Sequence, residues 1–109
     1  MSIVKVIRYR TKADRADENA ELVRAVFAEL AADDPGGLRY VTLRLEDGVS
    51  FVHVAMLEGD VNPLASSAAF TRFQSEIAQR CDEGPIAQDA TVVGSYAFDV
   101  HSSGPPGGG

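Results

Sequence analysis

An Asp47–Gly48 pair between two strand-like runs is the feature that most restricts how this chain can fold. Residues 38–46 and 49–57 are rich in β-branched and aromatic side chains, and an Asp-Gly pair between such runs is a strong signal for a tight hairpin. The turn predicts a register in which Thr42 lies opposite His53. Because side chains alternate along a strand, this register also divides the hairpin into two faces.

The two faces of the predicted hairpin differ in composition. One is aliphatic, and we expect it to pack against helices: Val41, Leu43, Leu45, Val52, Val54 and Met56. The other is mixed and aromatic, and we expect it to be the open face of the sheet: Tyr40, Thr42, Arg44, Phe51, His53, Ala55 and Leu57. A monomer seldom leaves so large an apolar patch exposed, so the pattern predicts a homodimer that pairs sheet to sheet.

The remainder of the chain alternates between strand and helix patterns. Strands are predicted at residues 3–10 and 91–100, and helices at about 15–32 and from Pro63 to about Arg80, with an irregular segment at 82–89. The order strand, helix, strand, strand, helix, strand predicts an α+β, ferredoxin-like βαββαβ fold. In that fold a four-stranded antiparallel sheet carries both helices on one face.

Length, charge and cysteine content restrict the classes of protein. The 109 residues fit one domain, expected at 1–100, and the Gly/Pro/Ser-rich residues 101–109 are expected to be a disordered tail. A net charge of −6 lacks the basic surface of nucleic-acid binders. No signal peptide or membrane span is recognisable, and the single cysteine, Cys81, has no internal partner. We expect a cytoplasmic protein that binds neither nucleic acid nor membrane.

Four segments of the chain resemble the dimeric α+β barrel superfamily, which includes the antibiotic-biosynthesis monooxygenases. They are Val4-Lys5-Val6-Ile7-Arg8-Tyr9-Arg10, Phe51-Val52-His53-Val54-Ala55, Asn62-Pro63-Leu64 with Ala69-Phe70-Thr71-Arg72-Phe73, and Val93-Gly94-Ser95-Tyr96. The resemblance extends to about Val100 and is greatest to small actinobacterial-type members without an assigned activity. It implies a homodimer in which two sheets form a barrel with the helices outside.

The resemblance also bears on chemistry and cofactors. Haem-degrading members use a tryptophan and a helix-borne histidine, whereas this chain has no tryptophan and no histidine in its second predicted helix. His53, Cys81 and His101 are too scattered to form a metal site, so we expect no haem, flavin or metal. The resemblance implies a cofactor-independent monooxygenase that acts on a small aromatic or phenol-like substrate. A non-catalytic small-ligand-binding dimer and a purely structural dimer remain as alternatives.

His53 is the candidate base of such a site, and burial is expected to lower its pKa below 6.5. Arg8 and Arg10 share one face of the first strand, where guanidinium groups can stabilise an enolate or phenolate. The alternatives are a structural histidine in the dimer interface and arginines that pair with the acidic C-terminal half. Candidate ligand contacts are Tyr9, Tyr40, Thr42, Phe51 and Tyr96.

Overall fold

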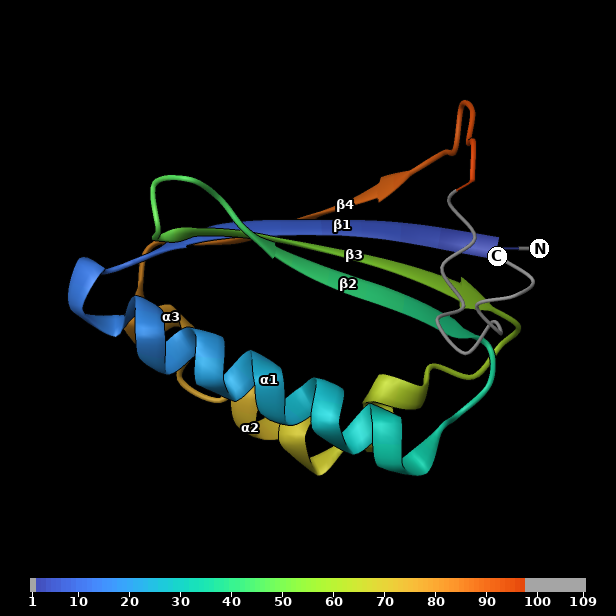
Figure 1. The fold of residues 1–109 in the computed structure, drawn as a ribbon, viewed down its shortest axis with the longest axis horizontal. Coiled ribbons are helices and arrows are strands. Elements are labelled where there is room, and N and C mark those ends of the chain that lie inside the picture. Colours follow the sequence, from blue (N-terminus) through green and yellow to red (C-terminus); the bar gives the residue numbers. More distant parts are fainter. Residues whose placement is uncertain (1, 98–109) are drawn as a thin grey trace.

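The computed structural model describes residues 2–97 as a four-stranded sheet with helices against one of its faces (Figure 1). The elements in chain order are β1 (Ser2–Thr11), the 3-10 helix η1 (Ala13–Arg15), α1 (Ala16–Asp33), β2 (Leu38–Arg44), β3 (Ser50–Glu58), the 3-10 helix η2 (Pro63–Ser66), α2 (Ala68–Gln74), α3 (Ile77–Arg80) and β4 (Cys81–Ala90). The strand order is β2-β3-β1-β4, and each pairing is antiparallel. The predicted ferredoxin-like α+β fold is confirmed. The predicted tail 101–109 lies outside the described residues.

The predicted hairpin register is confirmed. Thr42 pairs with His53 between β2 and β3. In the turn, the carboxylate of Asp47 accepts hydrogen bonds from the backbone N–H groups of Val49 and Ser50, at 2.9 and 2.8 Å. Gly48 has a φ of 79°, a conformation that glycine adopts without steric cost. Local turn chemistry therefore determines which side chains of the two strands meet.

The predicted orientation of the two hairpin faces is wrong. The mixed, aromatic face packs against the helices, where Phe51, His53, Ala55 and Leu57 are buried. The aliphatic face is open, and its exposed members include Leu43, at 48%. Average hydrophobicity favours the opposite arrangement. The mixed face can be buried because its polar side-chain atoms form hydrogen bonds with one another.

The C-terminal half departs from the predicted elements at two places. In place of one continuous helix, the chain forms η2, α2 and α3, with breaks at Ser67 and at Glu76, whose φ is 66°. The last strand is residues 81–90 instead of 91–100, and residues 91–97 form no strand. Pro85 is tolerated because β4 is an edge strand, where a missing N–H leaves no neighbour unpaired. Residues 98–100 lie outside the described range.

Helix α1 packs against the sheet through one stripe of buried residues. Asn19, Val23 and Val26 are buried at spacings of four and three residues. A carboxylate oxygen of Glu29 joins α1 to the next helix by accepting from Ser67 Oγ and the Ala69 N–H, at 2.6 and 2.9 Å. These contacts hold α1 and α2 side by side over the aromatic face of the sheet.

Gly37 provides a test of the connection between α1 and β2. Its φ is 80°, and a Cβ at this position would lie 2.9 Å from the backbone oxygen of Glu58. We expect Gly37→Ala to lower the free energy of unfolding by about 1–3 kcal/mol, measured by urea denaturation. Gly36→Ala is the matched control, because a Cβ at Gly36 has no neighbour within 4 Å. Equal stability of the two variants would contradict this prediction.

Candidate functional site

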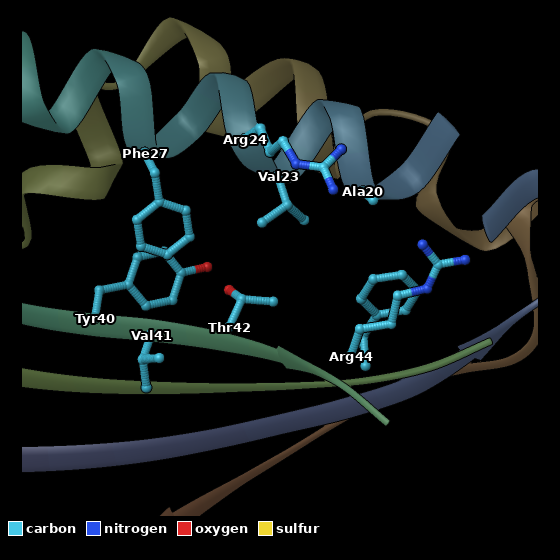
Figure 2. A pocket seen from close by; sticks show the side chains of 9 residues that line it. Ala20, Val23, Arg24, Phe27, Tyr40, Val41, Thr42 and Arg44 are labelled. Carbon is cyan, nitrogen blue, oxygen red and sulfur yellow. The ribbon is translucent and has the colours of Figure 1, made fainter. Parts of the chain in front are cut away.

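A cavity of about 330 Å³ opens between α1 and the edge strand β2 (Figure 2). Its apolar walls are formed by Val23 and Phe27 of α1 and by Phe51 of β3. The ring of Phe27 stacks on that of Tyr40 at a centroid distance of 4.9 Å. A cavity of this size with flat aromatic walls suits a small planar molecule.

Two hydroxyl groups and two guanidinium groups provide the polar part of the cavity lining. Tyr40 and Thr42, two residues apart on β2, both extend toward α1, and their hydroxyl groups lie near each other (Figure 2). Arg24 and Arg44 also line the cavity, and each is paired with a carboxylate: Arg24 with Glu21 and Arg44 with Asp17. The side chain of Arg44 is 36% exposed, and that of Arg24 is 66% exposed. Because both arginines are already paired with carboxylates, the hydroxyl groups of Tyr40 and Thr42 are the polar groups of the lining that are best placed to bind a ligand.

His53 lies directly behind these hydroxyl groups. Its Nδ1 is 2.7 Å from the Tyr40 hydroxyl and 3.1 Å from Thr42 Oγ1. Its other ring nitrogen, Nε2, is 2.8 Å from the hydroxyl of Tyr9 on the neighbouring strand. His53 is only 3% exposed and does not line the cavity itself. Its contact with the cavity is indirect, through its hydrogen bonds with Tyr40 and Thr42.

The hydrogen bonds continue from Tyr9 into the helices. Asn19 Nδ2 donates to the Tyr9 hydroxyl at 2.8 Å, and Arg80 Nε donates to Asn19 Oδ1 at 3.1 Å. The remaining Arg80 nitrogens donate to the backbone oxygens of Ser75 and Phe73, which the break between α2 and α3 leaves without helical partners. Asn19 and Arg80 are 0% and 2% exposed. The sheet, α1 and α3 thus share one buried polar network.

Burial keeps the titratable groups of this network neutral at pH 7, apart from the guanidinium. It lowers the pKa of His53 from 6.5 to about 4, as predicted in direction, because the charged ring loses its hydration. Burial raises the pKa of Tyr40 to about 12, although a hydrogen bond with Thr42 acts in the opposite sense. The pKa of Tyr9 is raised further, again chiefly by burial.

The structure brings together five of the residues that sequence analysis proposed for the site, and it separates three others from them. His53, Tyr9, Tyr40, Thr42 and Phe51 lie between the sheet and the helices.

Arg8, Arg10 and Tyr96 lie away from this group. Arg8 and Arg10 are exposed on the opposite face of the sheet, and Arg10 forms an ion pair of 3.4 Å with Glu83 in the acidic C-terminal half. Tyr96 is 92% exposed, beyond the end of β4. None of these three side chains lines the cavity between α1 and β2.

Four residues of this region were not predicted from the sequence as part of the site: Asn19, Arg80, Arg24 and Arg44. Asn19 was visible as an amide on an otherwise apolar helical stripe, a position that requires a buried hydrogen-bond partner. Arg80 carries no comparable signal, because its burial depends on the break at Glu76, where the sequence has neither glycine nor proline.

Within residues 2–97, no three His, Cys, Asp or Glu side chains are grouped closely enough to bind a metal ion. Within the same range, no helix combines the length and the apolar character needed to span a membrane.

Solved structures share this fold, although no protein-family model and no curated protein sequence matches the chain. A candidate antibiotic biosynthesis monooxygenase from Nitrosomonas europaea has a TM-score of 0.68 and 18% identity, with 84% of this chain and 90% of that chain covered. A mutant of SnoaB, a cofactor-independent oxygenase from Streptomyces nogalater, has a TM-score of 0.62 and 17% identity over 88% and 97% of the two chains. A dimeric ferredoxin-like protein of unknown function from Jannaschia sp. CCS1 has a TM-score of 0.62 and 13% identity over 84% and 100%.

These similarities establish that the chain has the ferredoxin-like α+β fold found among antibiotic-biosynthesis monooxygenase structures, as its sequence predicts. At identities of 13–18% they establish the fold alone.

The pH dependence of stability tests the burial of His53. An unfolded chain binds a proton at this residue below about pH 6.5, whereas the folded chain does so only near pH 4. The free energy of unfolding therefore decreases as the pH falls from 6.5 toward 4, by about 2 kcal/mol between about pH 7.5 and about pH 5. We expect His53→Gln to remove most of this decrease, as measured by urea denaturation at both pH values.

The pH window separates His53 from the carboxyl groups. The pKa values of Glu18, Glu29 and Asp47 are held below their ordinary 4.5 and 3.8 by hydrogen bonds, so their contributions are lost only at more acidic pH. Parallel loss of stability in the wild type and in His53→Gln would show that His53 is not buried as a neutral ring.

Proposed function

We propose that this chain is a cofactor-independent monooxygenase that binds a small phenol-like aromatic substrate in the cavity between α1 and β2. The observation that carries the proposal is that an aromatic cavity of about 330 Å³ contains two hydroxyl groups that are backed by the only histidine in residues 2–97. The apolar walls bind the substrate ring, and the hydroxyl groups bind its oxygen. The shared fold of the monooxygenase structures supports the same class.

The chemistry requires the substrate to supply the electrons. In the conversion of a phenol to a quinone, one atom of O₂ enters the ring, the other leaves as water, and the phenol is oxidised. An ionised phenol gives up electrons more readily than a neutral one, so hydrogen bonds to its oxygen from Tyr40 and Thr42 would lower the barrier. Phe27 and Phe51 would hold the ring in place and exclude water from it.

We also propose that the protein is a homodimer, built through the open face of the sheet and located in the cytoplasm. The dimeric protein from Jannaschia sp. CCS1 has the same fold. The exposed aliphatic residues of this face are Val41, Leu43, Leu45 and Ile86. The chain after β4 rises from the same side of the sheet, away from the helices (Figure 1), and Val93 and Tyr96 are almost fully exposed there. A second copy would remove these side chains from water.

Oxygen consumption tests the catalytic proposal. We expect one- and two-ring phenols, such as 1-naphthol, to bind and to consume O₂ in an oxygen electrode. Tyr40→Phe and Thr42→Val should each weaken binding by about tenfold, because each removes one hydrogen bond to the substrate oxygen. Thr71→Val is the matched control, since Thr71 is exposed on α2. Binding without oxygen consumption would favour the alternative of a non-catalytic ligand-binding dimer.

Sedimentation tests the proposed dimer. We expect the wild type to sediment as a dimer at micromolar concentration, with an interface on the order of 2,000 Å² in total. Leu43→Glu should give a folded monomer, because it places a charge in the centre of the aliphatic face. Ala28→Glu, on the solvent side of α1, should remain dimeric. A monomeric wild type would rule out this assembly.

A further inference from the structure

Arg80 lies at one end of a series of buried hydrogen bonds, and Tyr40, in the cavity wall, lies at the other. The series passes from Arg80 to Asn19, Tyr9, His53 and Tyr40 through distances of 3.1, 2.8, 2.8 and 2.7 Å. The direction of such a series is the order in which each group donates a hydrogen bond to the next. An amide, a hydroxyl and an imidazole each combine a donor with an acceptor, so they allow either direction. A guanidinium group has donors only. Arg80 therefore determines the direction of the whole series.

The direction follows atom by atom from Arg80. Its Nε–H donates to Asn19, so the amide oxygen of Asn19 faces Arg80 and the Nδ2–H group faces Tyr9. The Tyr9 oxygen accepts that hydrogen bond. His53 Nε2 is the acceptor that lies within reach of the Tyr9 hydroxyl proton, and a buried O–H without an acceptor costs about 1–3 kcal/mol. Tyr9 thus donates to Nε2.

The neutral ring of His53 then carries its proton on Nδ1. The position of this proton decides whether the Tyr40 hydroxyl acts as a donor or as an acceptor toward the cavity. The Nδ1–H donates to the oxygen of Tyr40, its nearer partner, with Thr42 Oγ1 slightly farther away. The Tyr40 oxygen is occupied as an acceptor, and its own O–H is free to turn into the cavity as a donor. A hydroxyl that accepts a hydrogen bond is a stronger donor to the next group.

We propose that Arg80 acts as a remote positioning residue that makes the cavity a hydrogen-bond donor, so that its ligand is the oxyanion of a planar aromatic molecule, a phenolate or an enolate. This inference rests on the proposed function for the site and narrows its substrate class. It assigns His53 as a donor that holds Tyr40, in place of the base that sequence analysis proposed.

The charges around the cavity agree with an anionic ligand. Arg80 is buried, and its hydrogen bonds within the described residues go to amide and backbone oxygens. Its positive charge acts on Tyr9 of the series, whose pKa it lowers against the larger effect of burial, as well as on Glu18 outside the series. Arg80 itself does not line the cavity. The charged side chains that do are Arg24 and Arg44, both cationic and both paired with exposed carboxylates of α1. Tyr9, Tyr40 and His53 are neutral at pH 7.

4-Nitrophenol is a suitable probe, because its phenolate is coloured and its phenol is not. We expect the full-length protein to bind the phenolate about tenfold more tightly than the phenol, which lowers the apparent pKa of the bound probe by about one unit. Tyr40→Phe should remove the preference while 4-nitroanisole, which cannot ionise, still binds. Failure of 4-nitrophenol to bind, or binding of both forms with equal affinity, would overturn the proposal.

Asn19→Asp tests the direction of the series without a change in side-chain shape. Aspartate can accept from Arg80 but cannot donate to Tyr9, so Tyr9 would donate to it and His53 would move its proton to Nε2. The new carboxylate also balances the charge of Arg80, which favours a folded variant. We expect the ¹⁵N spectrum of the His53 ring to show the Nδ1–H tautomer in the wild type and the Nε2–H tautomer in Asn19→Asp. The phenolate preference should fall about tenfold in the variant.

Glu18→Gln is the matched control for charge. Glu18 is close enough to Arg80 for the guanidinium to lower its pKa, but it hydrogen-bonds to Arg15 outside the series. We expect neither the His53 tautomer nor the phenolate preference to change. An Nε2–H tautomer in the wild type, or an unchanged tautomer in Asn19→Asp, would overturn the proposal. Both readouts are independent of turnover, so phenolate selectivity without oxygen consumption would count against the monooxygenase proposal alone.

Discussion

The hydrogen bonds that Tyr9 and His53 share with their neighbours are the interaction on which the rest of this structure depends. A buried polar group without a partner costs about 1–3 kcal/mol, and in residues 2–97 every buried side-chain nitrogen and oxygen has one. This internal pairing allows the aromatic face of the sheet to lie against the helices. The aliphatic face is then the one left open. The same arrangement therefore produces both an apolar-walled cavity that contains two hydroxyl groups and an exposed apolar surface.

Arg80 connects the helical layer to that arrangement. The chain breaks between α2 and α3, and the guanidinium binds backbone oxygens that the break leaves free. A cation is favourable at the C-terminal end of a helix, so part of its charge is stabilised there. The same side chain reaches Asn19 and so the sheet. A side chain that binds the free carbonyl groups at a helix end is therefore also the start of the hydrogen bonds that lead to the cavity.

Much of the candidate site could be predicted because its residues are close in a strongly specified hairpin. Tyr40, Thr42 and His53 follow from the turn at Asp47 and from the alternation of side chains, which need no information from elsewhere in the chain. Tyr9 was predicted as a ligand contact, and it lies on the buried face of β1, opposite to Arg8 and Arg10. Arg80 could not be predicted, because a break in a helix without glycine or proline has no local signal and its contacts span 61 residues to Asn19.

The sequence by itself determined the order of elements, the hairpin register and the apolar stripe of α1, because turn geometry and side-chain periodicity are local properties of the chain. Only the tertiary structure decided which face of the sheet meets the helices and where the last strand begins. The two faces of β2 and β3 are both apolar enough to be buried. The choice between them depends on whether the buried polar atoms find partners. His53 Nε2 has its partner in Tyr9 of β1, and the Tyr9 hydroxyl in turn has Asn19 of α1. Hydrogen-bond satisfaction across distant segments is a property of the folded chain, so no local pattern contains it.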